Sequence, residues 1–199
     1  GNELLYNTLN VSSVNIKEIK EVEGGGFIIV TSKEVFKINS EFVLQWSESF
    51  NGHNVYDLDV SQGECIVVTF PTSVSMEDYL TGAHFRAYKL DINSGNQLSY
   101  NIFNDVTTIV SGGHRSVSCK SIEVSSDGGY IFTCDEKVST FNDMSVLIKT
   151  NSNFDVQWIK DIGLSASSDP NVKDALVLND GSIIVSGTWM GNGSTYEAF

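Results

Sequence analysis

The sequence has very few cysteines and prolines, three and two respectively in 199 residues. Cys65, Cys119 and Cys134 form no C-x-x-C pair and no metal-ligand spacing, which argues against a disulfide-rich scaffold and a structural zinc site. Cys65 lies in the apolar run CIVV and is expected to be a buried thiol. Cys119 and Cys134 flank one expected hairpin, so we predict that they are cross-strand neighbours. The odd cysteine count favours free thiols over a disulfide, which stays the alternative.

Basic residues are also scarce, with 12 Lys and Arg against 25 Asp and Glu, a net charge of −13 and a pI near 4.4. The basic residues never cluster, which argues against a nucleic-acid partner and against binding to an anionic membrane surface. No apolar run approaches the roughly 20 residues that span a bilayer, so no transmembrane segment is expected. The apolar fraction of 41% is ample for a buried core.

The chain repeats one short phrase after a turn rich in Gly, Asn and Ser. It reads VLQW at 43–46, QLSY at 97–100 and VQWI at 156–159. A short alternating stretch that contains Lys precedes each copy, which is the pattern of a hairpin. A second hairpin pattern lies upstream in each unit and occurs a fourth time as LVLNDGSIIVSG at 176–187. Each unit therefore holds four short strands.

A four-stranded unit of about 40–50 residues repeated in tandem is typical of a β-propeller blade. We predict an all-β fold, a small β-propeller of about four four-stranded antiparallel blades in a single domain. The expected blades are 14–50, 54–104, 115–163, and 172–199 completed by 2–9. The N-terminal GNELLYNTLNV aligns with 153–163, so it is predicted to supply the outermost strand of the last blade and close the ring. The alternative is a part of a larger propeller.

The segment YKLDINSGNQLSYN at 88–101 resembles the repeat of quinoprotein (PQQ-like) propellers, in which Asp, a Thr/Ser-Gly turn and a Trp or Tyr recur. The stretches around 129–163 and 180–199 also resemble bacterial repeats called delta-60-like. The resemblance implies a propeller and an exported or surface-attached bacterial protein, periplasmic or extracellular. Gly1 is similar to a residue left by tag removal, so a leader is not expected within this sequence. The few blades and the positions of the tryptophans predict no quinone, so we expect no cofactor.

Ligand sites of propellers are expected over the central channel. The face concerned carries two kinds of loop, those that lead from one blade into the next and those that join the second and third strands of a blade. His53 and His114 precede the first strands of neighbouring blades, and Arg115 follows His114. With Asp57 or Asp169 they could ligate a transition metal. The favoured alternative is that each His hydrogen-bonds to its own loop, so no metal is predicted.

Two further segments are candidates for ligand binding. Met76 and Tyr79 lie in the long loop PTSVSMEDYLTG, which is either a partner-binding tip or a short helix that covers the propeller face. Trp189, placed in a loop at 187–194, could stack on a sugar or anchor a protein, or fill the seam between blades.

These features favour a non-catalytic binding or scaffold propeller that contacts a glycan or a protein. One alternative is a structural module of a larger assembly. Another is a glycan-processing enzyme, for which Asp57, Asp59 and Asp174 are the nearest channel carboxylates. The sequence does not decide whether the chain is an enzyme, although the lack of a nucleophile motif argues against it. The oligomeric state is not predicted.

Overall fold

The structure, a computed structural model, describes residues 15–72, 83–104, 117–137, 143–162, 171–190 and 196–198, which contain strands and turns but no helix. The first sheet comprises β1 (Ile16–Glu21), β2 (Phe27–Thr31), β3 (Glu34–Ile38) and β4 (Leu44–Ser49). The second comprises β5 (His53–Ser61), β6 (Glu64–Pro71), β7 (Ala83–Asp91) and β8 (Gln97–Asn104). The third comprises β9 (Val117–Val124), β10 (Tyr130–Lys137), β11 (Asp143–Thr150) and β12 (Val156–Asp161). The fourth comprises β13 (Asn171–Val177), β14 (Ile183–Met190) and β15 (Tyr196–Ala198).

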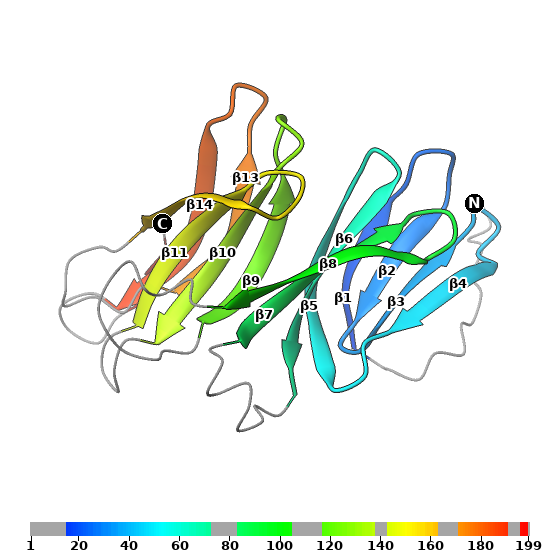
Figure 1. Cartoon of the computed structure of the whole chain (residues 1–199), viewed down its shortest axis with the longest axis horizontal. Coiled ribbons are helices and arrows are strands. Elements are labelled where there is room, and N and C mark those ends of the chain that lie inside the picture. The colour runs from blue at the N-terminus through cyan, green and yellow to red at the C-terminus, as the bar shows by residue number, and fades with distance from the viewer. Residues whose placement is uncertain are drawn as a thin grey trace, which may run out of the picture.

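All strand pairs are antiparallel and join strands that follow one another in the chain. The sheets lie in chain order, with the first and fourth at opposite ends of the row (Figure 1). Their first strands, β1, β5, β9 and β13, contact one another in succession. Four-stranded sheets that stand face to face with their first strands toward a common axis form a β-propeller arrangement, so the predicted all-β propeller is confirmed.

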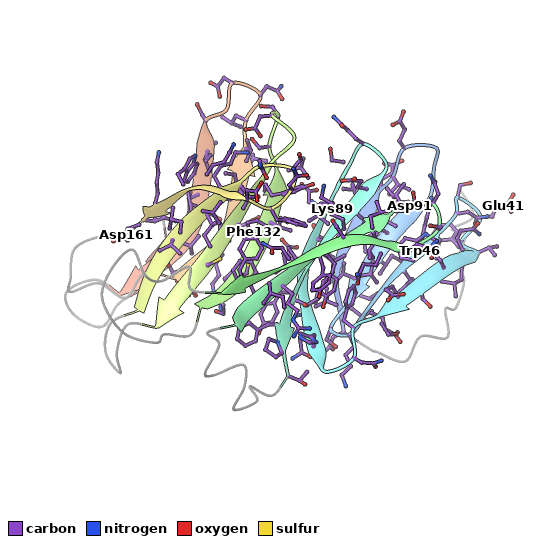
Figure 2. The ribbon with its side chains drawn as sticks, in the orientation of Figure 1. Glu41, Trp46, Lys89, Asp91, Phe132 and Asp161 are labelled. Carbon is purple, nitrogen blue, oxygen red and sulfur yellow. The ribbon has the colours of Figure 1, made fainter. Side chains whose placement is uncertain are left out.

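The core lies between the sheets rather than within one layer (Figure 2). One apolar cluster joins the first and second sheets, a larger one joins the second and third, and a smaller one joins the third and fourth. In the largest, Phe132 of β10 packs against Phe85 and Phe103, with ring centroids 5.5 and 5.1 Å apart. Alternation along each strand supplies an apolar residue to either face, so every inner sheet is buried on both sides.

The repeated phrase forms the outermost strand of each of the first three sheets, as β4, β8 and β12. Trp46 of β4 donates its Nε1–H to the carbonyl of Ile92 in the second sheet, at 3.1 Å. At the corresponding turn of the third sheet, the carbonyl of Phe154 accepts a hydrogen bond from the Asn101 amide, at 3.4 Å. The turn before each outer strand therefore also connects neighbouring sheets.

The closing strand predicted at 2–9 lies outside the described residues, and the fourth sheet has three described strands. The predicted loop position of Trp189 is wrong, because β14 continues to Met190 and Trp189 pairs with Glu197 of β15. Residues Thr188–Met190 include types that favour β-strands, so β14 continues past Gly187, where the sequence suggested that the strand ends.

In the described part of the chain, no helix has the length and apolarity that crossing a membrane requires.

Candidate functional site

The first strands of all four sheets line one polar groove of about 300 Å³. The groove is lined by Lys17, Glu18, Lys20, Asp57, Lys120, Ser121, Glu123, Lys173 and Asp174. None of these side chains is apolar. The size lies at the lower end of small-molecule sites, which usually measure about 300–1,000 Å³.

A β-bulge at the same position of each first strand builds this groove. The register of each strand skips one residue, and the four extra residues are Lys17, Tyr56, Lys120 and Lys173. A bulge bends its strand and interrupts the strict alternation of side chains between the two faces of the sheet. The side chains at the bulge therefore point in a new direction. Four equivalent bulges therefore bring polar side chains from four sheets to one place.

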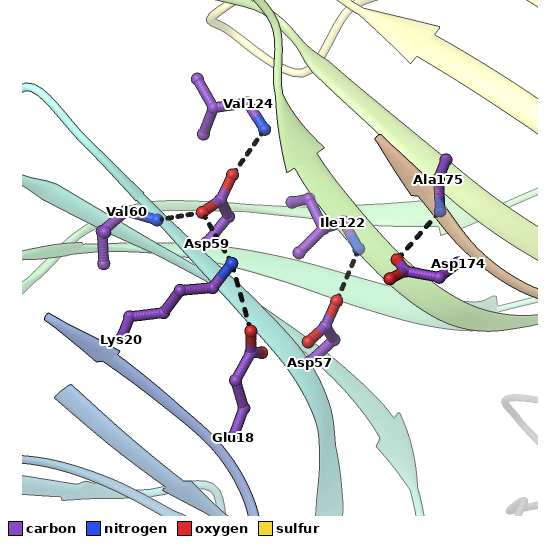
Figure 3. A network of polar contacts seen from close by, with 9 residues as sticks. All are labelled: Glu18, Lys20, Asp57, Asp59, Val60, Ile122, Val124, Asp174 and Ala175. Carbon is purple, nitrogen blue, oxygen red and sulfur yellow. Dashed lines mark hydrogen bonds and ion pairs between the residues drawn. The ribbon is translucent and has the colours of Figure 1, made fainter. Parts of the chain in front are cut away.

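Two aspartates of the second sheet bind the edge of the third (Figure 3). Asp57 Oδ2 accepts the backbone N–H of Ile122 at 2.8 Å, and Asp59 Oδ2 accepts that of Val124 at 2.7 Å. Asp59 Oδ1 also accepts the N–H of Val60 in its own strand, at 2.8 Å. These carboxylates satisfy backbone donors on the inner edge of β9 that no neighbouring strand pairs, so they fix the second sheet against the third.

The Asp57 carboxyl group lies beside Glu18 of the first sheet. Burial, the hydrogen bond with Glu18 and the negative charge of Glu18 raise the pKa of Asp57 to about 9. Glu18 Oε2 is buried and has no hydrogen-bond partner in the described structure. A proton held on Asp57 can be donated to this oxygen, because a protonated carboxyl group is a hydrogen-bond donor.

Lys20 and Glu123 extend the polar network across three sheets. Lys20 Nζ lies 3.1 Å from Glu18 and 3.4 Å from Asp59. Burial lowers the pKa of Lys20, but the charges of Asp59 and Glu18 more than compensate, so the pKa is raised. Burial, followed by the charge of Asp59, raises the pKa of Glu123 to about 7. The groove thus holds cations, carboxylates and carboxylic acids together near neutral pH.

The groove is basic relative to the rest of the protein. It contains four of the chain's twelve Lys and Arg residues, although the chain carries a net charge of −13. Lys17 lies 4.4 Å from the centre of the Tyr56 ring and also hydrogen-bonds to the carbonyl of Val55. Lys120 lies 3.5 Å from Asp135. Lys17, Lys20 and Lys120 are therefore held in place by their neighbours instead of extending freely into solvent.

The predicted site residues fall into three groups. Asp57 lies in the groove, whereas His53, the first residue of β5, lines a different pocket of about 230 Å³ with Lys33 and Thr72. His53 Nδ1 donates to the carbonyl of Asn51 at 3.0 Å, as the loop-capping alternative predicts. The residues Met76, Tyr79, His114, Arg115 and Asp169 lie outside the described residues. For Trp189 the structure gives the backbone alone.

The proposed combination of His53 with Asp57 as metal ligands is not supported, because the two residues line different pockets. In the part of the chain that the structure describes, no group of three or more His, Cys, Asp and Glu is arranged to hold a metal. Cys119 and Cys134 are direct cross-strand partners and free thiols, so their predicted proximity is confirmed.

Most groove residues were missed by sequence reasoning, although a signal exists. The first strands contain the segments IKEI, VYDL, CKSI and VKDA, each with two adjacent polar or aromatic residues between apolar ones. Two such residues in succession break strict alternation, which is the mark of a bulge. Four breaks at one repeat position predict a shared polar site on the propeller axis.

No family model matches the chain, and no curated protein sequence is similar to it. The fold is nevertheless shared with solved structures. A Bacteroides caccae protein of unknown function matches with 12% identity and a TM-score of 0.56, over 92% of this chain and 60% of its own. An endo-arabinase from Bacteroides thetaiotaomicron matches with 10% identity and a TM-score of 0.55, over 96% and 76%. A europium-containing methanol dehydrogenase matches with 11% identity and a TM-score of 0.52, over 89% and 38%.

These identities show the fold alone. The chain spans about 60% of the length of the first of these structures and about 38% of the methanol dehydrogenase.

Proposed function

We propose that the protein is a non-catalytic binding propeller whose inner-strand groove holds part of a glycan. The observation that carries this proposal is the convergence of four bulged strands on one groove that offers both hydrogen-bond donors and acceptors. Lysine ammonium groups donate hydrogen bonds and carboxylates accept them. Sugar hydroxyl groups are themselves donors and acceptors, so they match such a lining.

The shape of the site also favours a sugar over a folded protein partner. A groove of about 300 Å³ accommodates a small polar unit, whereas a protein interface needs a broad surface with an apolar centre. The mixed charge of the lining gives no strong preference for an anion, since Glu18 and Asp174 oppose the lysines. A neutral glycan therefore fits better than a polyphosphate.

The likeness to an endo-arabinase supports arabinan as the first glycan to test, although it shows the fold alone. We expect arabinan oligosaccharides to bind in isothermal titration calorimetry. Replacing Glu123 with Gln or Lys173 with Ala should weaken binding about tenfold, which corresponds to the loss of one charge-assisted hydrogen bond. Glu41→Gln is a matched control, because Glu41 is exposed in the turn before β4 and lies outside the groove.

The proposal fails if no oligosaccharide in a panel of neutral plant and bacterial glycans binds. It also fails if binding occurs but the groove variants and Glu41→Gln all keep the affinity of the parent chain.

A glycan-processing enzyme is the second candidate, and one specific observation favours it. The pKa of Asp57 is raised to about 9 beside Glu18, and a carboxyl group with a raised pKa is what a general acid requires. The binding role ranks first because Asp57 also accepts the N–H of Ile122, which gives this carboxyl a structural task. An assay for reducing ends released from arabinan tests this candidate. Release by the parent chain that is lost in Asp57→Asn and in Glu18→Gln would favour the enzyme.

The proposal places the protein outside the cytoplasm, periplasmic or at the surface of a bacterium, where polysaccharides are met. The support is the resemblance of its repeats to those of exported bacterial propellers. Fractionation of cells that express the full gene tests this part of the proposal.

A further inference from the structure

The turn that joins the first and second sheets carries an Asn–Gly dipeptide. Asn51 and Gly52 lie between β4 and β5, and both are exposed. The N–H of His53 donates to the carbonyl of Phe50 at 3.0 Å, which closes a four-residue turn. Gly52 has a φ of 74°, and the space around its missing Cβ atom is open. Because glycine has no side chain, its backbone nitrogen is the least hindered nucleophile that can follow an asparagine.

The two groups that a cyclisation would join are unrestrained. Among the residues that the structure describes, no hydrogen bond holds the side-chain amide of Asn51 or the N–H of Gly52. The turn is held instead through a carbonyl, because Thr72 donates its N–H and its hydroxyl to the carbonyl of Gly52, at 2.8 and 3.1 Å. The side-chain amide and the backbone nitrogen are therefore free to react.

The imidazole of His53 acts on the peptide group between Asn51 and Gly52. Its Nδ1 lies 3.0 Å from the carbonyl oxygen of Asn51 and carries the proton, since a carbonyl only accepts. The other ring nitrogen, Nε2, has no partner among the described residues. The Asn51 carbonyl and the Gly52 N–H belong to one peptide group, so negative charge spreads onto this oxygen when the nitrogen loses its proton. A donor on the oxygen stabilises that charge and makes the nitrogen easier to deprotonate.

We propose that Asn51 is a self-modification site, at which His53 promotes cyclisation to a succinimide and then deamidation. The Gly52 nitrogen attacks Cγ of Asn51, and a C–N bond forms. The side-chain nitrogen leaves as ammonia, which takes up the proton that Gly52 loses. Water then adds across one of the two C–N bonds of the imide, which leaves aspartate or isoaspartate at position 51. The balance needs only water.

Either product changes the joint between the first two sheets. A carboxylate replaces the amide in a pocket that Lys33 and Glu34 also line. Isoaspartate in addition inserts one carbon atom into the backbone between β4 and β5, just before the strand whose bulge at Tyr56 helps to build the groove. The reaction depends on the turn alone and not on glycan binding.

Peptide mapping by mass spectrometry during incubation at neutral pH tests the reaction. We expect the peptide that contains residue 51 to gain the mass difference between O and NH, and an isoaspartyl methyltransferase assay to detect isoaspartate. His53→Ala should slow this gain about fivefold, as expected for the loss of one hydrogen bond. Thr72→Val is a matched control, because it removes a side-chain hydrogen bond to the carbonyl of Gly52, which belongs to the next peptide group. It should leave the rate unchanged.

Hydrogen exchange of the Gly52 amide, followed by NMR, is a second measurement. Base-catalysed exchange passes through the same peptide anion, so His53→Ala should slow it and Thr72→Val should not. In the parent chain, Gly52 should exchange faster than in the chain unfolded by guanidinium chloride, a comparison that needs no variant.

Circular dichroism checks that both variants fold. An asparagine at position 51 that stays intact overturns the proposal, and so does slower exchange of Gly52 in the native than in the unfolded parent chain. Equal slowing by His53→Ala and Thr72→Val would also overturn it, because loosening of the turn would then set the rate.

Discussion

The indole ring of Trp46 lies directly against Gly95 of the neighbouring sheet. A Cβ atom at Gly95 would lie 2.7 Å from ring carbons of Trp46, and the backbone there has φ near +74°. The indole N–H also donates to the carbonyl of Ile92 in the same turn. Glycine thus serves two purposes, since it permits the left-handed turn and lets the aromatic ring of the first sheet approach the backbone of the second.

Gly95→Ala should therefore destabilise the protein by about 2 kcal/mol or more, from the positive φ and from the collision with Trp46. Gly52→Ala is a matched control, because Gly52 has the same φ of +74° and open space around its Cβ position. The difference between the two variants in urea unfolding isolates the contact with Trp46. Equal losses would show that the ring does not limit this position.

Trp46→Phe keeps an aromatic ring but removes the indole N–H. We expect a loss of about 1 kcal/mol for the hydrogen bond to Ile92, and a larger loss for Trp46→Ala. In the Trp46→Ala background, Gly95→Ala should cost no more than Gly52→Ala. A double-mutant cycle that finds the two sites additive would contradict the contact.

The protonated Asp57 makes folding stability depend on pH. The folded chain holds this proton to about pH 9, whereas the unfolded chain releases it near the ordinary value of 3.8. Between these values the folded state binds more protons, so this group's contribution to the free energy of unfolding falls as pH rises. Asp57→Asn resembles the protonated acid and should remove that dependence.

Urea unfolding of Asp57→Asn and the parent chain at pH 5 and pH 8.5 measures the effect. The variant should gain several kcal/mol of stability relative to the parent between the two pH values, since the linkage amounts to about 1.4 kcal/mol for each pH unit. Asp155→Asn, an exposed change in the turn before β12, is the control. If the free energy of unfolding changes equally with pH in the parent chain and in Asp57→Asn, then Asp57 is ionised in the folded chain.

The three cysteines test the apolar clusters on the two sides of the second sheet. Cys65, Cys119 and Cys134 are buried free thiols, and burial raises the pKa of Cys65 and Cys119. Ellman's reagent should react slowly with the native chain and titrate three thiols once guanidinium chloride unfolds it. One thiol per unfolded chain would reveal a disulfide between Cys119 and Cys134.

The repeat allowed the strands, the sheet order and the outermost strand of the first three sheets to be predicted, because alternation and turn residues are local signals. The proximity of Cys119 and Cys134 followed from the same hairpin pattern. The groove could not be predicted in this way, since it depends on Lys17, Asp57, Lys120 and Lys173, which meet only through packing of four sheets. His53 and Asp57 are close in sequence but line different pockets, because four residues of extended strand separate them by more than 10 Å.

The most direct test of the account is an NMR titration of the ¹⁵N-labelled chain with arabinan oligosaccharides. If the four bulges form one binding site, the amide signals of Lys17, Tyr56, Lys120 and Lys173 should shift together, with a single dissociation constant. Signals of the outer strands β4, β8 and β12 should stay in place. Shifts confined to the outer strands, or to one sheet alone, would contradict a shared groove at the inner strands.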